Sequence, residues 1–331
     1  MRGWRLIVVV IVVAVAAAAT YVWRAYKQPL DMPDERVEVR IVAGSSARAI
    51  ARQLQQAGVG VNVEAFVAAA RATGATQSLR AGRYEVTRGM NLLAVVDRLR
   101  RGEVLREHLT IVEGSTFAEM RLVLNNHPEL RKDTASMSDD EVLRAIGADE
   151  TYPEGLFAPE TYVFDTGSSD LEILRQAYRA QRAIVQKAWE SRAEGLPYRT
   201  AYEALVMASI VEKETGVSSD RGRIAGVFVN RLQRGMLLQT DPTVIYGLGT
   251  KFDGNLHKRD LLADTPYNTY TRAGLPPTPI ALPGRASIAA ALNPEQTKAL
   301  YFVSRGDGTS EFSETLTDHN RAVEKYQLGV R

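Results

Sequence analysis

The first half of the chain carries one pattern of apolar and polar positions three times. Each copy begins with a short β-rich stretch, continues through a Gly-x-[Ser/Thr/Asn] turn, and has apolar residues six and ten positions after the glycine. These two apolar positions share a helix face, and the Ser, Thr or Asn suits the N-cap. The pattern therefore predicts three strand–turn–helix units. The glycines and their apolar pairs are Gly44 with Ile50 and Leu54, Gly89 with Val95 and Leu99, and Gly114 with Met120 and Leu124.

With a further helix expected at 63–72, these units predict a small α+β module over residues 37–106. The module is similar to LysM modules, which bind glycans that contain N-acetylglucosamine. A shared supersecondary unit without glycan binding is the alternative. Residues 107–125 repeat the pattern and belong either to this module or to the domain that follows. The expected N-caps are Ser46, Asn91 and Thr116, and the expected strands are 37–42, 83–86 and 109–112.

The second half of the chain predicts longer helices separated by stiff loops. Apolar stripes favour helices at 170–193, 199–215 and 220–234, and the polar stretch 131–150 favours a surface helix or insertion. Residues 107–331 are thus predicted as a larger mixed helical and β domain, so the fold class of the whole chain is α+β. The loops, rich in Pro, Gly, amides and aromatics, are 154–162, 239–247, 266–270 and 274–277.

The N-terminus predicts a membrane anchor. An apolar run over residues 6–24 is close to the ~20 residues that cross a bilayer, with aromatic residues at both ends. A cleaved signal peptide at Ala16–Ala19 is the alternative. With residues 1–5 inside and 25–36 as a linker, we expect a single-pass protein whose C-terminal part lies outside the cytoplasm.

Composition narrows the chemistry. The 331 residues include no cysteine and four scattered histidines, and the net charge is +2. The absence of cysteine excludes disulfides and thiolate nucleophiles. The scattered histidines disfavour the usual zinc motifs. We expect no metal and no cofactor. Nothing in the sequence indicates binding to nucleic acid.

Glu212 is the expected catalytic residue. It follows the almost continuous apolar run 204–211, so it shares a face with residues predicted to be buried. Burial and the negative end of the helix dipole would both raise the pKa of its carboxyl. A protonated carboxyl that donates near neutral pH is what cleavage of a glycosidic bond requires. The alternative is a structural Glu paired with a nearby Arg or Lys.

The stiff loops predict the rest of a sugar-binding groove. Amide, hydroxyl and aromatic side chains suit the hydroxyls, N-acetyl groups and apolar faces of sugars. Asp241 precedes Pro242, and such a pair is more often a cap or an Asx turn. The candidate substrate-binding residues are Glu160, Thr161, Tyr162, Gln239, Thr240, Asp241, Tyr246, Asn268 and Tyr270.

Across nearly its whole length the chain resembles the YceG-like family of endolytic murein transglycosylases of bacterial inner membranes. The resemblance implies an enzyme that cuts peptidoglycan strands at the MurNAc-β-1,4-GlcNAc bond without water and leaves 1,6-anhydro-muramyl ends, which would terminate nascent strands. It places the catalytic Glu at Glu212, as acid and then base. The matching blocks are 154–162, 208–215, 230–232, 239–247, 267–270 and 274–277.

Three alternatives stay open. Glu214 is a rival to Glu212 and lies ~200° around the helix from it. A muramidase-type hydrolase would use Asp241 or Glu214 as a second carboxylate. A non-catalytic scaffold would bind the cell wall through the LysM-like module alone. In each case the short linker keeps the site near the inner membrane, where peptidoglycan synthases are candidate partners.

Overall fold

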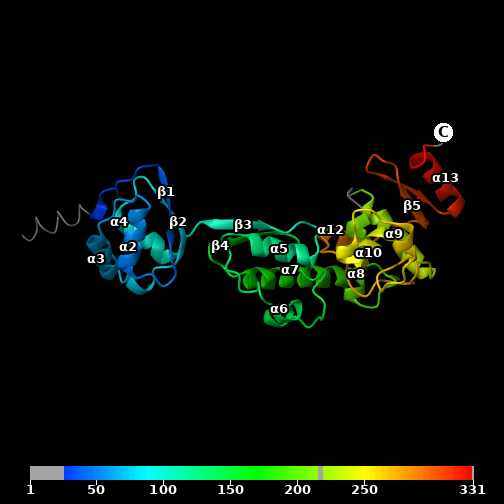
Figure 1. The fold of residues 1–331 in the computed structure, drawn as a ribbon, viewed down its shortest axis with the longest axis horizontal. Helices are drawn as coiled ribbons and strands as arrows, with labels where there is room; N and C mark the ends of the chain where they lie inside the picture. The colour runs from blue at the N-terminus through cyan, green and yellow to red at the C-terminus, as the bar shows by residue number, and fades with distance from the viewer. Residues whose placement is uncertain (1–25, 215–218, 330–331) are drawn as a thin grey trace, which may run out of the picture. The chain divides into compact units, whose positions relative to one another are not determined.

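The computed structural model describes residues 26–214 and 219–329, which divide into two compact units (Figure 1). The first unit contains the described residues up to Glu107 together with Val163–Ser168. The second contains His108–Tyr162 and the described residues from Ser169 onward. Helices mixed with two-stranded sheets give the α+β class that the sequence predicts.

The first unit is a two-stranded antiparallel sheet packed with three α-helices. The strands pair from Arg36↔Thr87 to Ile41↔Gly82, and their side chains alternate between buried and less buried positions, as expected for a sheet with one covered face. The core joins strand residues such as Val39 to helix residues such as Leu54. The elements are β1 (Arg36–Ile41), α2 (Ala47–Gln56), α3 (Val63–Ala72), η1 (Ala75–Gln77), β2 (Gly82–Thr87) and α4 (Leu92–Arg101).

The repeated sequence pattern has the predicted local structure. Ser46, Asn91 and Thr116 are the N-caps of α2, α4 and α5 (Phe117–Asn126), and each side chain accepts a hydrogen bond from the backbone N–H three residues later. The apolar pairs of the pattern are all buried. The third copy, after residue 107, lies in the second unit, and the strand expected at 109–112 is β3 (Arg106–Thr110), which pairs with β4 (Thr161–Asp165).

Part of the predicted linker is packed against the first unit. The N–H of Leu30 donates to the carbonyl of Met90 at 2.8 Å, and the N–H of Gly60 donates to the carbonyl of Asp31 at 2.7 Å. The apolar side chain of Met32 is buried in the core of this unit. The free part of any linker is therefore shorter than the sequence suggests.

The second unit is mainly helical. The helices expected at 170–193, 199–215 and 220–234 are present with slightly shorter bounds, and the polar stretch 131–150 contains α6, whose inner face is buried. The loop expected at 239–247 is instead largely helix α10. The elements are α6 (Asp139–Ile146), α7 (Asp170–Glu190), α8 (Ala201–Glu214), α9 (Arg221–Gln233), α10 (Asp241–Leu248), η2 (Gly249–Lys251), α11 (Lys258–Leu262), α12 (Arg285–Leu292), β5 (Tyr301–Ser304), β6 (Ser310–Ser313) and α13 (Leu316–Tyr326).

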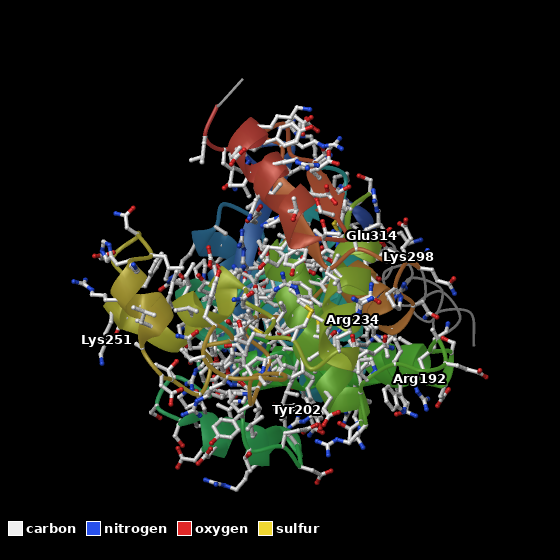
Figure 2. All side chains as sticks on the ribbon, turned by 90° about the vertical axis from the view of Figure 1, so that its right-hand side faces the viewer. Arg192, Tyr202, Arg234, Lys251, Lys298 and Glu314 are labelled. Atoms are coloured by element: carbon white, nitrogen blue, oxygen red, sulfur yellow. The ribbon has the colours of Figure 1, made fainter. Side chains whose placement is uncertain are left out.

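Helix α8 lies at the centre of the second unit, in contact with α7, α9, α10 and α12. Its small residues, such as Ala208 and Ser209, are fully buried and let neighbouring backbone approach closely. The Ser209 hydroxyl donates to the carbonyl of Val206 and accepts from the N–H of Ile280. Charged side chains such as Arg192, Lys251 and Lys298 lie on the exterior (Figure 2). Because the apolar run of α8 packs against these four helices, it fixes the position of the C-terminal end of α8.

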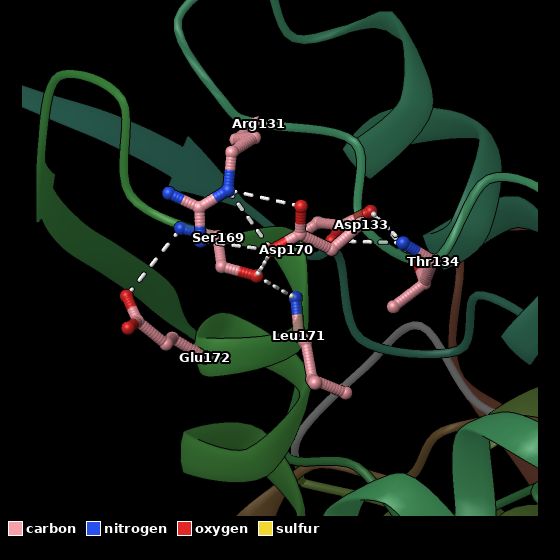
Figure 3. Close-up of polar contacts among 7 residues, drawn as sticks. All are labelled: Arg131, Asp133, Thr134, Ser169, Asp170, Leu171 and Glu172. Atoms are coloured by element: carbon pink, nitrogen blue, oxygen red, sulfur yellow. Dashed lines mark hydrogen bonds and ion pairs between the residues drawn. The ribbon is translucent and has the colours of Figure 1, made fainter. Parts of the chain in front are cut away.

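The start of α7 is held by a buried carboxylate (Figure 3). Ser169 is the N-cap and forms a capping box with Glu172. Asp170 is completely buried, and it accepts a hydrogen bond from the Thr134 hydroxyl at 2.7 Å and from the Thr134 N–H. The segment before α6 is thereby joined to the N-terminus of α7.

Within residues 26–214 and 219–329, none of the helices is both long and apolar enough to span a bilayer. The anchor predicted at 6–24 lies outside these described residues.

Candidate active site

Helix α8 ends with two carboxylates that face different surroundings. Glu212 and Glu214 are two positions apart, which places their side chains about 200° apart around the helix axis. Their hydrogen-bond partners differ accordingly, because Glu212 contacts Gly284 while Glu214 contacts Thr240. The sequence therefore brings one carboxylate to each side of the helix end.

Glu212 is held at the N-terminus of α12. Its Oε2 accepts a hydrogen bond from the N–H of Gly284 at 2.9 Å, one residue before α12 begins. A helix N-terminus favours negative charge beside it. The neighbouring Lys213 donates to the carbonyl of Gly114 at 3.2 Å. Glu212 is half-buried, so it is more exposed than the apolar run before it led us to expect. The reason is that the apolar face of α8 ends at Val211.

Glu214 is half-buried, as Glu212 is, but its carboxyl is desolvated. Its Oε1 accepts a hydrogen bond from the hydroxyl of Thr240. Burial raises the pKa of Glu214 to about 7, the nearby Asp241 adds to the rise, and the Thr240 hydrogen bond and the charge of Arg231 oppose it. A carboxyl with such a pKa is partly protonated at neutral pH and can both donate and accept a proton.

Glu214 lines a cavity of about 510 Å³. This volume falls within the range of ligand pockets, about 300–1,000 Å³. The walls come from α9, the loop before α10, the residue Tyr270, the hairpin β5–β6 and helix α13. Its polar and aromatic lining residues include Glu214, Arg231, Gln239, Asp241, Tyr270, Tyr301, Ser304, Ser310, His319 and Gln327.

The loop before α10 is fixed by backbone and side-chain contacts. Gln239 has a φ of 51°, which is uncommon for a residue with a side chain. Its N–H donates to the carbonyl of Thr269 at 3.1 Å, and the Thr240 N–H donates to the Thr269 hydroxyl at 3.0 Å. The Tyr270 hydroxyl donates to Asp241 at 2.5 Å. These contacts hold Gln239, Asp241 and Tyr270 in the wall of the cavity.

Arg231 supports this wall from α9. Its side chain is buried and donates to the carbonyls of Leu300, Leu237 and Leu238, at 2.6, 3.2 and 2.8 Å. The guanidinium also lies 5.1 Å from the ring centre of Tyr301. The residue joins α9 to the loop before α10 and to strand β5. The sequence offered little to single out Arg231, because its partners are backbone carbonyls.

Four predicted substrate residues lie away from this cavity. Glu160 pairs with Arg285, and Thr161 shares a hydrogen bond with Thr110. Tyr162 is buried and donates to the carbonyl of Ala158, whereas Tyr246 donates to Glu154. None of the four is among the residues that line the cavity. Of the predicted residues, Gln239, Asp241 and Tyr270 line the cavity. Thr240 does not line it but donates to Glu214, which does.

Asn268 has a structural environment. It is fully buried, and its amide N–H groups donate to the carbonyls of Asp260, Leu261 and Ala263, while its oxygen accepts from the N–H of Tyr270. The side chain thereby closes the 260–270 segment and positions Tyr270.

Glu154 is a second buried carboxylate, which the sequence did not single out as a site residue. It accepts hydrogen bonds from the N–H of Phe117 at 2.9 Å and from the hydroxyl of Tyr246 at 3.0 Å. Burial raises its pKa to about 7, against the effect of these hydrogen bonds. It connects the start of α5 to α10.

The positions of the described acidic and histidine side chains can be compared with the clusters that bind metal ions. Among these residues His, Asp and Glu form no group of three or more that could bind a metal ion.

Comparison with known proteins gives consistent results. The model of the YceG-like family matches residues 39–325. A protein of Bacillus subtilis (strain 168) named endolytic murein transglycosylase is 34% identical over 307 residues, covering 88% of this chain and 84% of that protein. A protein of the same name from Streptococcus pneumoniae serotype 2 is 28% identical over 337 residues, and the match covers 90% of this chain but only 60% of that protein.

A solved structure also matches. The crystal structure of a YceG-like protein from Listeria monocytogenes has a TM-score of 0.56 and 32% sequence identity to this chain. The match covers 87% of this chain and 98% of that one.

Proposed function

This chain belongs to the YceG-like family, and on that basis we propose that it is an endolytic murein transglycosylase that cleaves the glycan strands of peptidoglycan. The relatives that carry this name in Bacillus and Streptococcus support the proposal. So does a desolvated carboxyl in the wall of a cavity lined with polar and aromatic groups. The bond cleaved is the MurNAc-β-1,4-GlcNAc linkage, and the product carries a 1,6-anhydro-MurNAc end.

The observation that carries the mechanism is the environment of Glu214. A general acid needs a carboxyl that is protonated near the working pH, and burial gives Glu214 a pKa of about 7. The protonated carboxyl donates its proton to the glycosidic oxygen as the C1–O bond breaks. The resulting carboxylate then accepts the proton of the muramyl C6 hydroxyl, whose oxygen forms the new bond to C1. The proton returns to Glu214, and no water is consumed.

Glu212 stays the competing assignment. The sequence pattern and the family resemblance favour it, but its carboxylate accepts the N–H of Gly284 beside the N-terminus of α12. That contact suits a residue that holds α8 against α12. We therefore place the acid at Glu214 and expect Glu212 to position the helix end.

A hydrolase is the second candidate function. Asp241 lines the same cavity as Glu214. Glycosidases that use water usually have two carboxylates in one cleft. The hydrogen bond from Tyr270 holds Asp241 in place. Product mass separates the two reactions, because an anhydro end lacks one water relative to a reducing end.

The test is digestion of purified peptidoglycan sacs by the full chain, followed by mass spectrometry of the fragments. We expect anhydro ends from the wild type. Glu214→Gln should lower the rate by about 10²- to 10⁴-fold, as expected for loss of a general acid, while Glu212→Gln keeps a larger share of activity. Glu190→Gln, on the exposed end of α7, is the matched control.

Each alternative predicts a different result. Reducing ends instead of anhydro ends would establish the hydrolase. A Glu212→Gln variant that is folded but inactive, beside an active Glu214→Gln, would return the catalytic role to Glu212. If both variants and the wild type left the sacs intact, the scaffold hypothesis would be favoured.

We further propose that the protein is anchored in the bacterial inner membrane by residues 6–24, with its C-terminal domain in the periplasm. The apolar run with flanking aromatic residues supports this. Such an anchor would keep the enzyme beside newly made strands and peptidoglycan synthases, and cleavage there would terminate strand elongation. Membrane fractionation, with protease added outside intact spheroplasts, tests both the anchor and its orientation.

A further inference from the structure

The cavity beside Glu214 extends to the C-terminal part of the chain. Strand β5 contributes Tyr301 and Ser304, β6 contributes Ser310, and α13 contributes His319 and Val323. This outer half of the cavity, the wall formed by β5, β6 and α13, contains no residue to which the sequence or the proposed reaction gives a role.

His319 has an unmet hydrogen-bonding capacity in this wall. Its ring stacks on Tyr301, with ring centres 5.2 Å apart and planes 24° apart. Its Nδ1 is buried and has no hydrogen-bond partner among the residues that the structure describes. Leaving a buried polar atom without a partner is unfavourable. A ligand atom that reached Nδ1 would recover that cost.

The charges around the cavity select for an uncharged ligand. Burial, and then the charge of Arg231, lower the pKa of His319, so the imidazole is neutral at neutral pH. Glu214 and Asp241 disfavour an anion at the inner end. Arg231, the cation in the wall, already donates to Leu300, Leu238 and Gln239, which leaves it poorly placed to bind a carboxylate.

We propose that the outer half of the cavity binds an N-acetylhexosamine ring without a charged substituent, with His319 Nδ1 hydrogen-bonded to a hydroxyl or to the acetamido group of that ring. A neutral imidazole offers one donor and one acceptor, and both ring substituents can pair with either. Tyr301 and Ser310, whose side chains carry hydroxyl groups, line the same cavity.

The subsite would set which bond is cleaved, and in this respect it rests on the proposed function. One cavity joins His319 to Glu214, so a ring held at His319 fixes the register of the strand relative to the acid. A muramyl ring carries a lactyl group and a charged peptide. The uncharged space at His319 therefore suits the N-acetylglucosamine type of ring.

The probe is chitotetraose, a tetramer of N-acetylglucosamine, titrated into the full chain in detergent and followed by calorimetry. We expect saturable binding to the wild type. His319→Phe keeps a stacking ring but removes Nδ1, and it should weaken binding at least about tenfold. His319→Asn, whose amide reaches the place of Nδ1, should stay within about threefold of the wild type.

Two further variants keep the test decisive. His108→Phe, the same exchange at an exposed position on β3, should bind as the wild type does. Val323→Trp fills the outer half of the cavity and should abolish binding even if His319→Phe fails to fold. Binding that survives both His319→Phe and Val323→Trp lies elsewhere on the chain and overturns the inference, as does a wild type that binds no chitotetraose at millimolar concentration.

The two proposals fail separately. A wild type that digests peptidoglycan but does not bind chitotetraose through His319 refutes the subsite and keeps the enzyme. Chitotetraose binding that depends on His319, without digestion, keeps the subsite and refutes the enzyme.

Discussion

Glu212 and Glu214, the two carboxylates at the end of α8, have different hydrogen-bond partners. Glu212 accepts a hydrogen bond from the backbone N–H of Gly284, whereas Glu214 accepts one from the Thr240 hydroxyl. At Glu214 desolvation outweighs the Thr240 hydrogen bond, so the pKa of this carboxyl rises to about 7. The proposed division between a structural Glu212 and a catalytic Glu214 therefore rests on their neighbours and not on residue type.

This assignment predicts a pH dependence. A general acid works while protonated, so kcat/KM should fall as pH rises through about 7, the pKa of Glu214. Thr240→Val removes the donor that lowers this pKa, so the alkaline limb should move to higher pH. The measurement is initial rate on soluble glycan strands from pH 5 to 9.

The control for that variant is Thr151→Val at an exposed position, which should leave the profile unchanged. An alkaline limb that stays in place in Thr240→Val would mean that Glu214 is not the titrating acid.

At the scale of elements, α7 depends on a buried contact at its first turn (Figure 3). Asp170 is completely buried and accepts from both the N–H and the hydroxyl of Thr134. Asp170→Ala leaves these two donors without a partner, which should lower the free energy of unfolding by about 2–3 kcal/mol. Chemical denaturation measures the change.

Asp140→Ala, at an exposed position in the first turn of α6, is the comparison. It removes only a favourable interaction with the helix dipole and should cost under about 1 kcal/mol. Equal losses in the two variants would contradict the structural role of Asp170.

Helix α9 contains two glycines that should respond oppositely to alanine. A Cβ at Gly226 would lie 2.5 Å from the carbonyl oxygen of Glu295, which is backbone and cannot rotate away. At Gly222 the nearest atom would be 3.4 Å away, an ordinary contact. Gly226→Ala should therefore destabilise the protein by about 1–3 kcal/mol, whereas Gly222→Ala should be neutral or gain up to about 1 kcal/mol from helix propensity.

Thermal unfolding of both variants tests this prediction, with each acting as the other's control. A Gly226→Ala variant as stable as the wild type would show that the segment after α12 can move away from α9.

At the scale of the whole molecule, two carboxyls with raised pKa values lie in the second unit. Glu154 and Glu214 both have a pKa of about 7 in the folded protein, against a reference value of 4.5. Between these values the folded state binds more protons than the unfolded state, so stability falls as pH rises from about 4.5 to about 7 and then levels off.

Glu154→Gln isolates one of these groups. It cannot ionise, and its amide can still accept from Phe117 and pair with Tyr246. The loss of stability between pH 5 and pH 8 should be smaller than in the wild type by on the order of 2 kcal/mol. Urea unfolding followed by the fluorescence of Trp189, which lies in the second unit, measures it.

The exposed variant Glu190→Gln should lose as much stability between these pH values as the wild type does. If Glu154→Gln also did so, the buried carboxyl would not be the group that titrates.

Local signals in the sequence determined much of the secondary structure. The N-caps at Ser46, Asn91 and Thr116 were predictable because each bond joins residues three positions apart. Helix α3 has the bounds that its apolar spacing predicts, and α8 differs by only a residue or two at each end. Periodicity and capping act within one or two turns, so the sequence alone suffices for them.

The site was decided by contacts between distant segments. Glu214 meets Thr240, 26 residues away, and Glu212 meets Gly284, 72 residues away. The outer wall of the cavity comes from residues after 300, where the sequence shows no sugar-binding pattern. The sequence by itself determined that α8 ends in carboxylates and that polar loops accompany it. Only the tertiary structure decided which carboxyl lines the cavity and is desolvated there, because desolvation depends on the packed neighbours and not on helical spacing.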